Sequence, residues 1–244
     1  KATISGKVRY KNKIFNETGI GDVNATEFKP VRYADFDIIK ASDNKTVLNS
    51  GETDAKGNFT CDVTIKSGEA IILRCYAKQD NSDYKIQIKD FSGNIHYADS
   101  PQSTVAQDNV TVNLDIPETN DKGGAFNIFD CLVEGTKKVK ELSGSIPPLL
   151  TVNWQKGIAA ATRYKNNNVI ELNGSVDDPD EYDDAVILHE YGHFIMDKFS
   201  YSKSPGVIHH SNDTNQDIRL SWSEGWATFF SSLLRNNSLY VDVS

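Results

Sequence analysis

The stretch ILHEYGHF, residues 187–194, decides how the second half of this chain folds. It contains the pattern His-Glu-x-x-His, with His189 and His193 four residues apart. On a helix this spacing places both imidazoles on one face, about one turn apart, where two neutral nitrogens can share one Zn²⁺ ion. Glu190 follows the first histidine and is placed to act on a metal-bound water without being a ligand. The stretch therefore predicts a zinc site with Glu190 as the general base.

The residues around this stretch predict a helix over 181–199. Its apolar stripe consists of Ala185, Leu188, Gly192, Ile195, Met196 and Phe199. Six carboxylates lie within residues 177–184, where negative charge favours a helix N-terminus. The same carboxylates raise a calcium site as an alternative, although they lack EF-hand spacing.

A catalytic zinc ion needs three protein ligands and an open position, so a third ligand must come from another part of the chain. A metzincin would continue the motif with Gly and a third His. Met196 and Phe199 occupy those two places, and that class is therefore excluded.

Two sets of candidates remain for the third ligand. His209 and His210 lie on a polar loop after the motif helix, and Glu224 lies in a second predicted helix, residues 218–235. Glu224 could instead close a capping box with Ser221 at the start of that helix.

The sequence SEGWA, residues 223–227, resembles the Asn-Glu-Gly-Phe-Ala pattern of gluzincins, the thermolysin and aminopeptidase-like zinc peptidases. That resemblance implies a metal set of His189, His193 and Glu224, with Glu190 as the base. It implies a zincin-like α+β fold and zinc as the cofactor.

Gluzincins also carry an edge strand, a second strand and the zinc helix in that order, and residues 159–164, 169–172 and 181–199 follow it. An edge strand would hold an extended peptide by backbone hydrogen bonds. On this resemblance, Ala160, Ala161 and Thr162 would line the substrate.

Two features depart from the gluzincin pattern. Thirty residues separate His193 from Glu224 (224 − 193 − 1), which is more than in the best-known members. Twenty residues follow Glu224 (244 − 224), whereas gluzincins continue into a helical C-terminal subdomain that supplies an oxyanion-stabilising Tyr or His. We therefore expect that subdomain to be lacking, with Tyr240, His209 and His210 as the nearby substitutes.

The first 117 residues show short alternating strands separated by turns, a pattern typical of a β-sandwich. The strands are expected at residues 3–10, 35–39, 47–48, 59–65, 70–78, 84–89 and 110–116. Residues 4–8, 30–39 and 53–59 resemble a carboxypeptidase-regulatory-like, transthyretin-like domain. That family is a small all-β Greek-key sandwich, usually found beside secreted enzymes or in cell-surface proteins.

The chain is therefore expected to be multidomain. A sandwich over residues 1–117 is followed by a Gly-rich linker, 118–124, and an α+β metallopeptidase domain, 125–244. Within this second domain the sequence predicts a helix over residues 126–142 that ends at Gly144. Strands are expected at residues 149–154, 159–165 and 169–172.

Composition narrows the possible partners. The net charge of −8 over 244 residues, without a basic run, argues against nucleic acid. No segment approaches the roughly 18 apolar residues of a membrane span. Cys61 and Cys75 could face each other across a hairpin and form a disulfide, but with Cys131 they are also consistent with buried free thiols.

These features together predict a zinc-dependent peptidase that is monomeric, secreted or cell-surface, and acts on a peptide or protein substrate. The alternative is a surface binding or adhesion protein that carries a truncated or inactive metallopeptidase domain.

Overall fold

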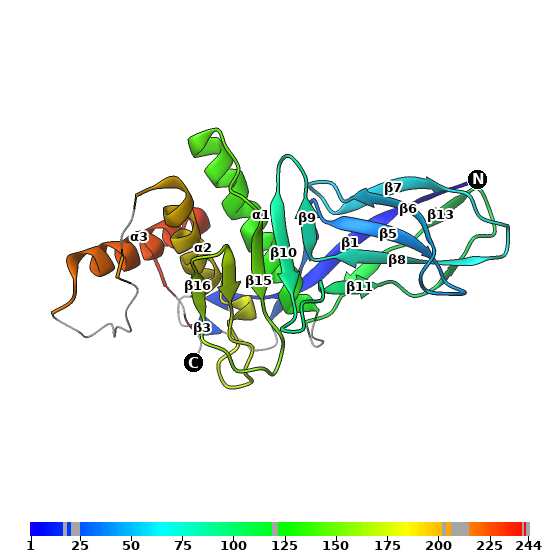
Figure 1. Ribbon diagram of the computed structural model, residues 1–244. Helices are drawn as coiled ribbons and strands as arrows, with labels where there is room; N and C mark the ends of the chain where they lie inside the picture. Colours follow the sequence, from blue (N-terminus) through cyan, green and yellow to red (C-terminus); the bar gives the residue numbers. More distant parts are fainter. Residues whose placement is uncertain are drawn as a thin grey trace.

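The computed structural model describes residues 1–16, 19–20, 25–118, 122–201, 204–205, 215–240 and 242. It contains a β-sandwich-like N-terminal region and a C-terminal α+β region. The sandwich lies at one end of the molecule and helices α2 and α3 lie at the other, with α1 between them (Figure 1). The multidomain α and β organisation that the sequence predicts is confirmed at this level.

The first sheet of the sandwich is built on one long strand, β1 (Ala2–Lys13). Alternate residues of β1 are buried, because successive side chains of a strand point to opposite faces. The first half of β1 pairs with β7 and β13, and the second half pairs with β4 and β14. These partners are β4 (Thr26–Pro30), β7 (Asn58–Val63), β13 (Asn109–Thr111) and β14 (Leu114–Ile116).

The second sheet has the order β11-β8-β5-β6, with β12 also paired to β8. Its strands are β5 (Asp35–Lys40), β6 (Val47–Glu52), β8 (Ala70–Tyr76), β11 (Tyr97–Asp99) and β12 (Ser103–Thr104). Phe36 of β5 meets Phe59 of β7 with ring centroids 4.9 Å apart. Both rings are buried, so this aromatic pair joins the two sheets across the core. A further pair, β2 (Phe15–Asn16) and β3 (Gly19–Ile20), forms a short hairpin.

The third sheet has the order β16-β17-β15-β10-β9 and belongs to the α+β region. Its strands are β9 (Lys78–Asp80), β10 (Lys85–Lys89), β15 (Leu150–Asn153), β16 (Arg163–Lys165) and β17 (Val169–Glu171). The parallel pair of β10 and β15 joins strands from the two sides of the predicted linker.

The assignment of residues 84–89 to the sandwich is therefore wrong. Ile86 and Ile88 are buried on one face of β10, and this alternation identifies a strand with one buried side. It carries no information about which sheet the strand joins, since that choice depends on residues more than 60 positions away (150 − 86 = 64).

Helix α1 (Gly123–Ser143) lies against β1 and β10. The predicted helix over residues 126–142 is confirmed, and its C-terminal Gly144 has φ 73° as expected for a left-handed cap. The helix begins inside the predicted linker, where a Cβ on Gly123 would lie 2.6 Å from the carbonyl oxygen of Pro117. Glycine there lets the chain turn tightly against the end of β14. The domain boundaries themselves stay a prediction.

The cysteines are free thiols in this structure. Cys61 lies in β7 opposite Ile4, and Cys75 lies in β8 opposite Phe36 and Ala98. The interpretation of these strands as one hairpin is wrong, because β7 and β8 belong to different sheets of the sandwich.

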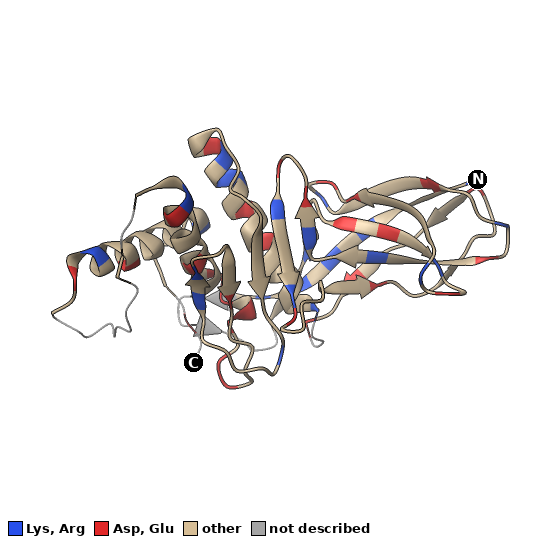
Figure 2. Ribbon diagram, viewed as in Figure 1, with Lys and Arg blue, Asp and Glu red and all other residues tan. Residues whose placement is uncertain are grey.

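Lys and Arg residues are interspersed with Asp and Glu residues over both regions of the molecule (Figure 2). Among the described residues, no helix has both the length and the apolar character that a membrane crossing requires.

A largely buried ion pair joins the sandwich to α1. The Nε of Arg32 donates to Oδ1 of Asp130 at 2.7 Å, and Arg32 also pairs with Glu134. The hydroxyl of Tyr10 donates to Oδ2 of Asp130 at 3.0 Å. Burial raises the pKa of Asp130, and the Arg32 guanidinium opposes that shift. Arg32 is therefore the main cation that compensates a carboxylate removed from water.

Replacing Arg32 with Met should lower the free energy of unfolding by about 3 kcal/mol, because Asp130 would stay buried without its cation. Arg9→Met is the matched control. Arg9 pairs with Asp115 at 2.7 Å, but both side chains are about two-fifths exposed, so its loss should cost less than about 1 kcal/mol. Urea unfolding monitored by tryptophan fluorescence measures both variants. Equal losses would show that the Arg32 contact does not support the junction.

Candidate metal centre

Two antiparallel helices, α2 (Asp184–Phe199) and α3 (Ile218–Arg235), build the centre. They pack closely because α2 has glycine at the crossing point, where a Cβ on Gly192 would lie 2.9 Å from Cα of Ala227. Two hydrogen bonds link side chains of α3 to backbone carbonyls of α2. Trp226 Nε1 donates to Gly192 at 3.3 Å, and Ser231 Oγ donates to Ala185 at 2.8 Å.

The close packing brings three potential ligand atoms together. The Nε2 atoms of His189 and His193 are 3.1 Å apart, and Oε2 of Glu224 lies 3.2 Å and 3.3 Å from them. A tetrahedral zinc ion with ligands at about 2.0–2.1 Å has ligand atoms about 3.3 Å from one another. The donor set and its spacing therefore fit a zinc ion held by two imidazoles and one carboxylate.

Glu224 points toward the histidines and not toward the end of its own helix. Asp217 caps α3, with its side chain accepting from the backbone N–H of Arg219 at 2.9 Å. The capping box of Ser221 and Glu224 is therefore wrong, because the helix begins at Ile218 and Ser221 already lies inside its first turn.

The other nitrogen of each imidazole meets a hydroxyl of α3. Nδ1 of His193 lies 3.2 Å from Oγ of Ser223, and Nδ1 of His189 lies 3.2 Å from Oγ1 of Thr228. An imidazole that donates its Nδ1 hydrogen presents the lone pair of Nε2 to a metal.

Sequence reasoning missed both hydroxyl partners. Thr228 stands four residues after Glu224 and thus on the same helix face. Once Glu224 is taken as a ligand, this spacing identifies Thr228 as a candidate partner of the histidines.

Glu190 lies between α2 and the edge of the third sheet. Its buried carboxylate accepts from the backbone N–H of Tyr164 at 2.6 Å. Tyr164 is the central residue of β16, and its N–H points away from β17 toward the centre. The unpaired edge of β16 is therefore the edge that faces Glu190.

The three residues predicted to line the substrate come before this short strand. The predicted strand over residues 159–165 is confirmed only for Arg163–Lys165. Ala161 is exposed and Ala160 is half-buried. Thr162 donates to Asp180 and accepts from the backbone N–H of Asn173 at 2.9 Å, so its hydroxyl holds the loop together. A substrate role for these residues stays a prediction.

Electrostatics favour an ionised Glu224. Burial alone would raise the pKa of Glu224, but hydrogen bonds to His189 and His193 hold it well below its ordinary value. Burial alone would lower the pKa of His193, but the carboxylates of Glu224 and Glu190 raise it. A concentration of negative charge thus faces the two imidazoles, as a divalent cation requires.

Tyr240 is the one predicted oxyanion substitute among the described residues. Its ring lies edge-on to His189, with centroids 5.8 Å apart. Burial and nearby carboxylates raise its pKa, so the phenol stays a hydrogen-bond donor. His209 and His210 lie outside the described residues.

The acidic run predicted at the helix start is largely buried. It forms the 3₁₀ turn Asp180–Tyr182 and leads into α2. Burial raises the pKa of Asp180 to about 6. Carboxylate oxygens of Asp178, Asp180 and Asp242 lie within 4.8 Å of one another, but nothing else in the described residues points to a calcium ion there.

Comparison with known proteins relates the C-terminal region to peptidases. The family model described as the Mycolysin C-terminal domain matches residues 145–244, which include His189, Glu190 and His193 of the motif and their partner Glu224. This domain is found in zinc peptidases. A search of curated proteins gives no match.

Several solved structures resemble parts of the chain only weakly. A 9R-lipoxygenase from Cyanothece PCC8801 is 14% identical with a TM-score of 0.23; the match covers 60% of this chain and 25% of the lipoxygenase. The shaft pilin SpaA from Lactobacillus rhamnosus GG is 16% identical with a TM-score of 0.25, over 49% of this chain and 52% of the pilin. The plantain pollen allergen Pla l 1 is 20% identical with a TM-score of 0.25, over 49% of this chain and 95% of the allergen. Nothing about function follows from these likenesses.

Replacing Gly192 with Ala should destabilise the protein by about 1–3 kcal/mol, because the new methyl group would push α3 away from α2. Gly225→Ala is the matched control on α3, since a Cβ there meets nothing within 4 Å. This control should gain up to about 1 kcal/mol from helix propensity. Thermal unfolding compares the two, and a Gly192→Ala variant at least as stable as Gly225→Ala would contradict the close-packing argument.

Proposed function

We propose that this chain is a zinc-dependent peptidase that hydrolyses peptide bonds, with His189, His193 and Glu224 as metal ligands and Glu190 as general base. The observation that carries the proposal is the convergence of the three ligand atoms within 3.3 Å, beside a buried Glu190 at a free strand edge. The family match supports it, because mycolysin-type peptidases are zinc enzymes.

When bound, a zinc ion would polarise the scissile carbonyl and make a water molecule more acidic. The chain's own residues would do the remaining work. At the outer edge of β16 the N–H of Tyr164 is donated to Glu190, which would leave the Tyr164 carbonyl for an extended peptide, and Ala160, Ala161 and Thr162 would continue that edge. Glu190 lies at this edge, where it can take a proton from the attacking water and pass it to the leaving amine.

Tyr240 would donate a hydrogen bond to the oxyanion from the side of His189. A secreted or cell-surface location belongs to the same proposal, since mycolysin-type peptidases are typically secreted, and the monomeric state stays a prediction from the sequence.

Replacing Glu190 with Gln should lower kcat by about 10²–10⁴-fold while one zinc ion per chain remains bound, because the amide keeps the shape but cannot accept the proton. Peptide-library cleavage and metal analysis of the purified protein measure the two quantities. His189→Ala serves as the comparison, since it should lose both zinc and activity. A zinc-loaded wild-type protein that cleaves no peptide would instead favour the binding or adhesion alternative.

Replacing Thr228 with Val should weaken zinc binding by about 10–100-fold, because His189 loses the partner that orients its ring. Ser231→Ala provides the control, since it removes a buried hydroxyl of the same helix that bonds to the backbone of α2 and not to a histidine. It should reduce stability without changing the zinc dissociation constant. Competition with a fluorescent chelator measures both, and unchanged zinc affinity in Thr228→Val would refute the orienting role.

A further inference from the structure

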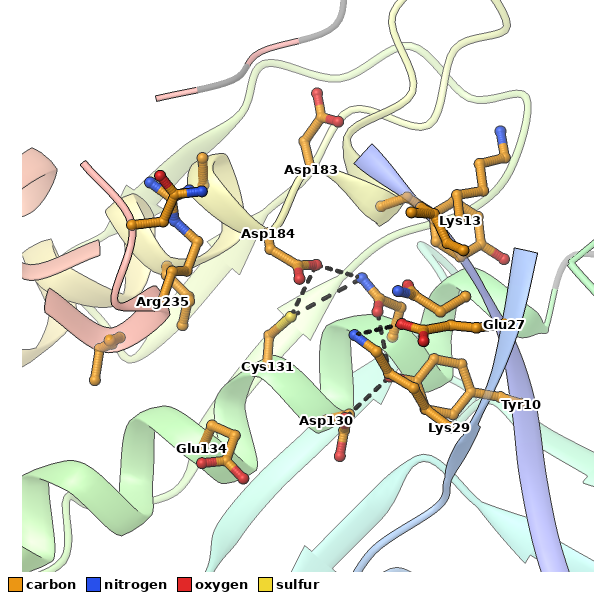
Figure 3. Close-up of a pocket in the computed structure, with 18 of the residues that line it drawn as sticks. Tyr10, Lys13, Glu27, Lys29, Asp130, Cys131, Glu134, Asp183, Asp184 and Arg235 are labelled. Carbon is orange, nitrogen blue, oxygen red and sulfur yellow. Dashed lines mark hydrogen bonds and ion pairs between the residues drawn. The ribbon is translucent and has the colours of Figure 1, made fainter. Parts of the chain in front are cut away.

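A cavity of about 800 Å³ lies between the sandwich and the helices, next to the metal centre. Its walls come from β1 and β4 on one side and from α1, the start of α2 and the end of α3 on the other (Figure 3). This volume falls within the range of small-ligand sites. Nothing in the proposed peptidase mechanism uses it.

Most carboxylates of the cavity wall are already compensated. Asp130 and Glu134 pair with Arg32. Oδ1 of Asp184 accepts from Nδ2 of Asn127 at 2.8 Å and from Sγ of Cys131 at 3.2 Å. The buried Asp183 is likewise partnered. Glu27, in contrast, lies at the rim with about half of its side chain exposed.

Two cations of the same wall, Arg235 and Lys13, lack a counter-ion among the described residues, and a third, Lys29, pairs only with the half-exposed Glu27. Arg235 donates to Oγ of Ser231 and to the carbonyl of Leu239, and no described carboxylate lies within ion-pair distance of Arg235 or Lys13. The nearest carboxylate oxygen to Nζ of Lys29 belongs to Glu27, at 3.8 Å. Burial lowers the pKa of Arg235. The charge of Asp184 partly opposes this shift, but a partly desolvated guanidinium without an ion-paired carboxylate is costly, and a bound anion would lower that cost.

Arg235 and Lys29 face the cavity from opposite sides. Figure 3 shows Arg235 on the α3 side of the cavity, and Lys29 entering from β4 toward Cys131 with a dashed line that joins it to Glu27. Arg235 could bind a ligand carboxylate with two parallel hydrogen bonds, and Lys29 adds positive charge on the opposite wall.

The cavity has two wall residues that directly precede residues of the metal centre in the sequence. Leu188 and Leu239 line it; Leu188 precedes the ligand His189, and Leu239 precedes Tyr240, which packs on that histidine. Asp184 is five residues before His189, about 7.5 Å along a helix, and Arg235 is eleven after Glu224, about 16 Å. An extended peptide rises about 3.3 Å per residue, so these two distances correspond to about two to five residues from the scissile bond.

We infer that this cavity binds a carboxylate of the peptide substrate, about two to five residues from the bond that is cleaved. The inference rests on the proposed peptidase function and adds a substrate class to it, namely peptides with an acidic side chain or a free C-terminus at that distance. The sandwich, through Lys29 and Lys13, thereby becomes part of the substrate-binding surface.

Equilibrium binding tests the inference without requiring turnover. Fluorescent peptides carry Glu, or Gln at the same place, about two to five residues on either side of a common core, and each is made with a free or an amidated C-terminus. Fluorescence anisotropy measures their affinity for the zinc-loaded Glu190→Gln protein. We expect one carboxylate peptide to bind about tenfold or more tighter than its neutral partner, as for hydrogen bonds to charged groups. Loss on Glu→Gln identifies the side chain, and loss on amidation identifies the C-terminus.

The preference should disappear in Arg235→Met and weaken in Lys29→Met. Arg219→Met, at the other end of α3 and paired with Asp217, and Lys7→Met, exposed on β1, are the controls that should keep it. If Arg235→Met fails to fold, Arg235→Lys keeps a charge and should retain part of the preference, and Lys29→Met remains an independent test.

Two outcomes separate this inference from the proposed function. Equal affinity for all carboxylate and neutral peptides, or a preference unchanged in both Lys29→Met and the Arg235 variants, would overturn the cavity assignment even if the protein cleaves peptides. A preference that depends on Arg235, in a protein whose wild-type form cleaves nothing, would support the cavity and refute the peptidase.

Discussion

The contact between Gly192 and Ala227 sets the distance between α2 and α3, and the metal centre depends on that distance. The two histidines are fixed relative to each other by helix geometry alone. The third ligand atom is not, because Glu224 comes from a separate helix after a long connection. It reaches the histidines because Gly192 has no methyl group, which lets the backbones of α2 and α3 approach closely. Trp226 and Ser231 then hold the helices at that spacing through carbonyls of α2.

One side of helix α3 contributes to the metal centre, to the contact with α2 and to the cavity. It places three side chains beside the histidines. Glu224 supplies a ligand, and Ser223 and Thr228 supply the two hydroxyl partners. Further along the same helix, Ser231 bonds to α2 and Arg235 reaches the cavity beside the sandwich. A small rotation of α3 would therefore move the ligand, the hydroxyl partners and the cavity cation together.

Local sequence patterns predicted the helices and strands well, but they did not predict which of these elements lie next to one another. The bounds of α3 and the spacing of His189 and His193 follow from short-range periodicity, which is visible within a few helical turns of sequence. Other features depend on partners far away in sequence. These are the sheet that β10 joins, the separation of Cys61 from Cys75, and the short extent of β16. Ser221 and Glu224 matched a capping motif, but Asp217 starts the helix four residues earlier, and the side chain of Glu224 bonds to two imidazoles. Thr162 was expected to face a substrate, whereas the buried Asp180 takes up its hydroxyl.

The pairing of β10 with β15 also determines the order in which the chain can fold. Ile86 must meet Leu150, 64 residues later (150 − 86), with all of α1 between them. Closing such a distance costs loop entropy before any of the pairing is gained, and parallel strands of high sequence separation form slowly. During synthesis, the sandwich strands can pair before β15 has left the ribosome and become available to β10. Until then the edge of β10 is open to pairing with other chains, and α1 is the element that can shield it.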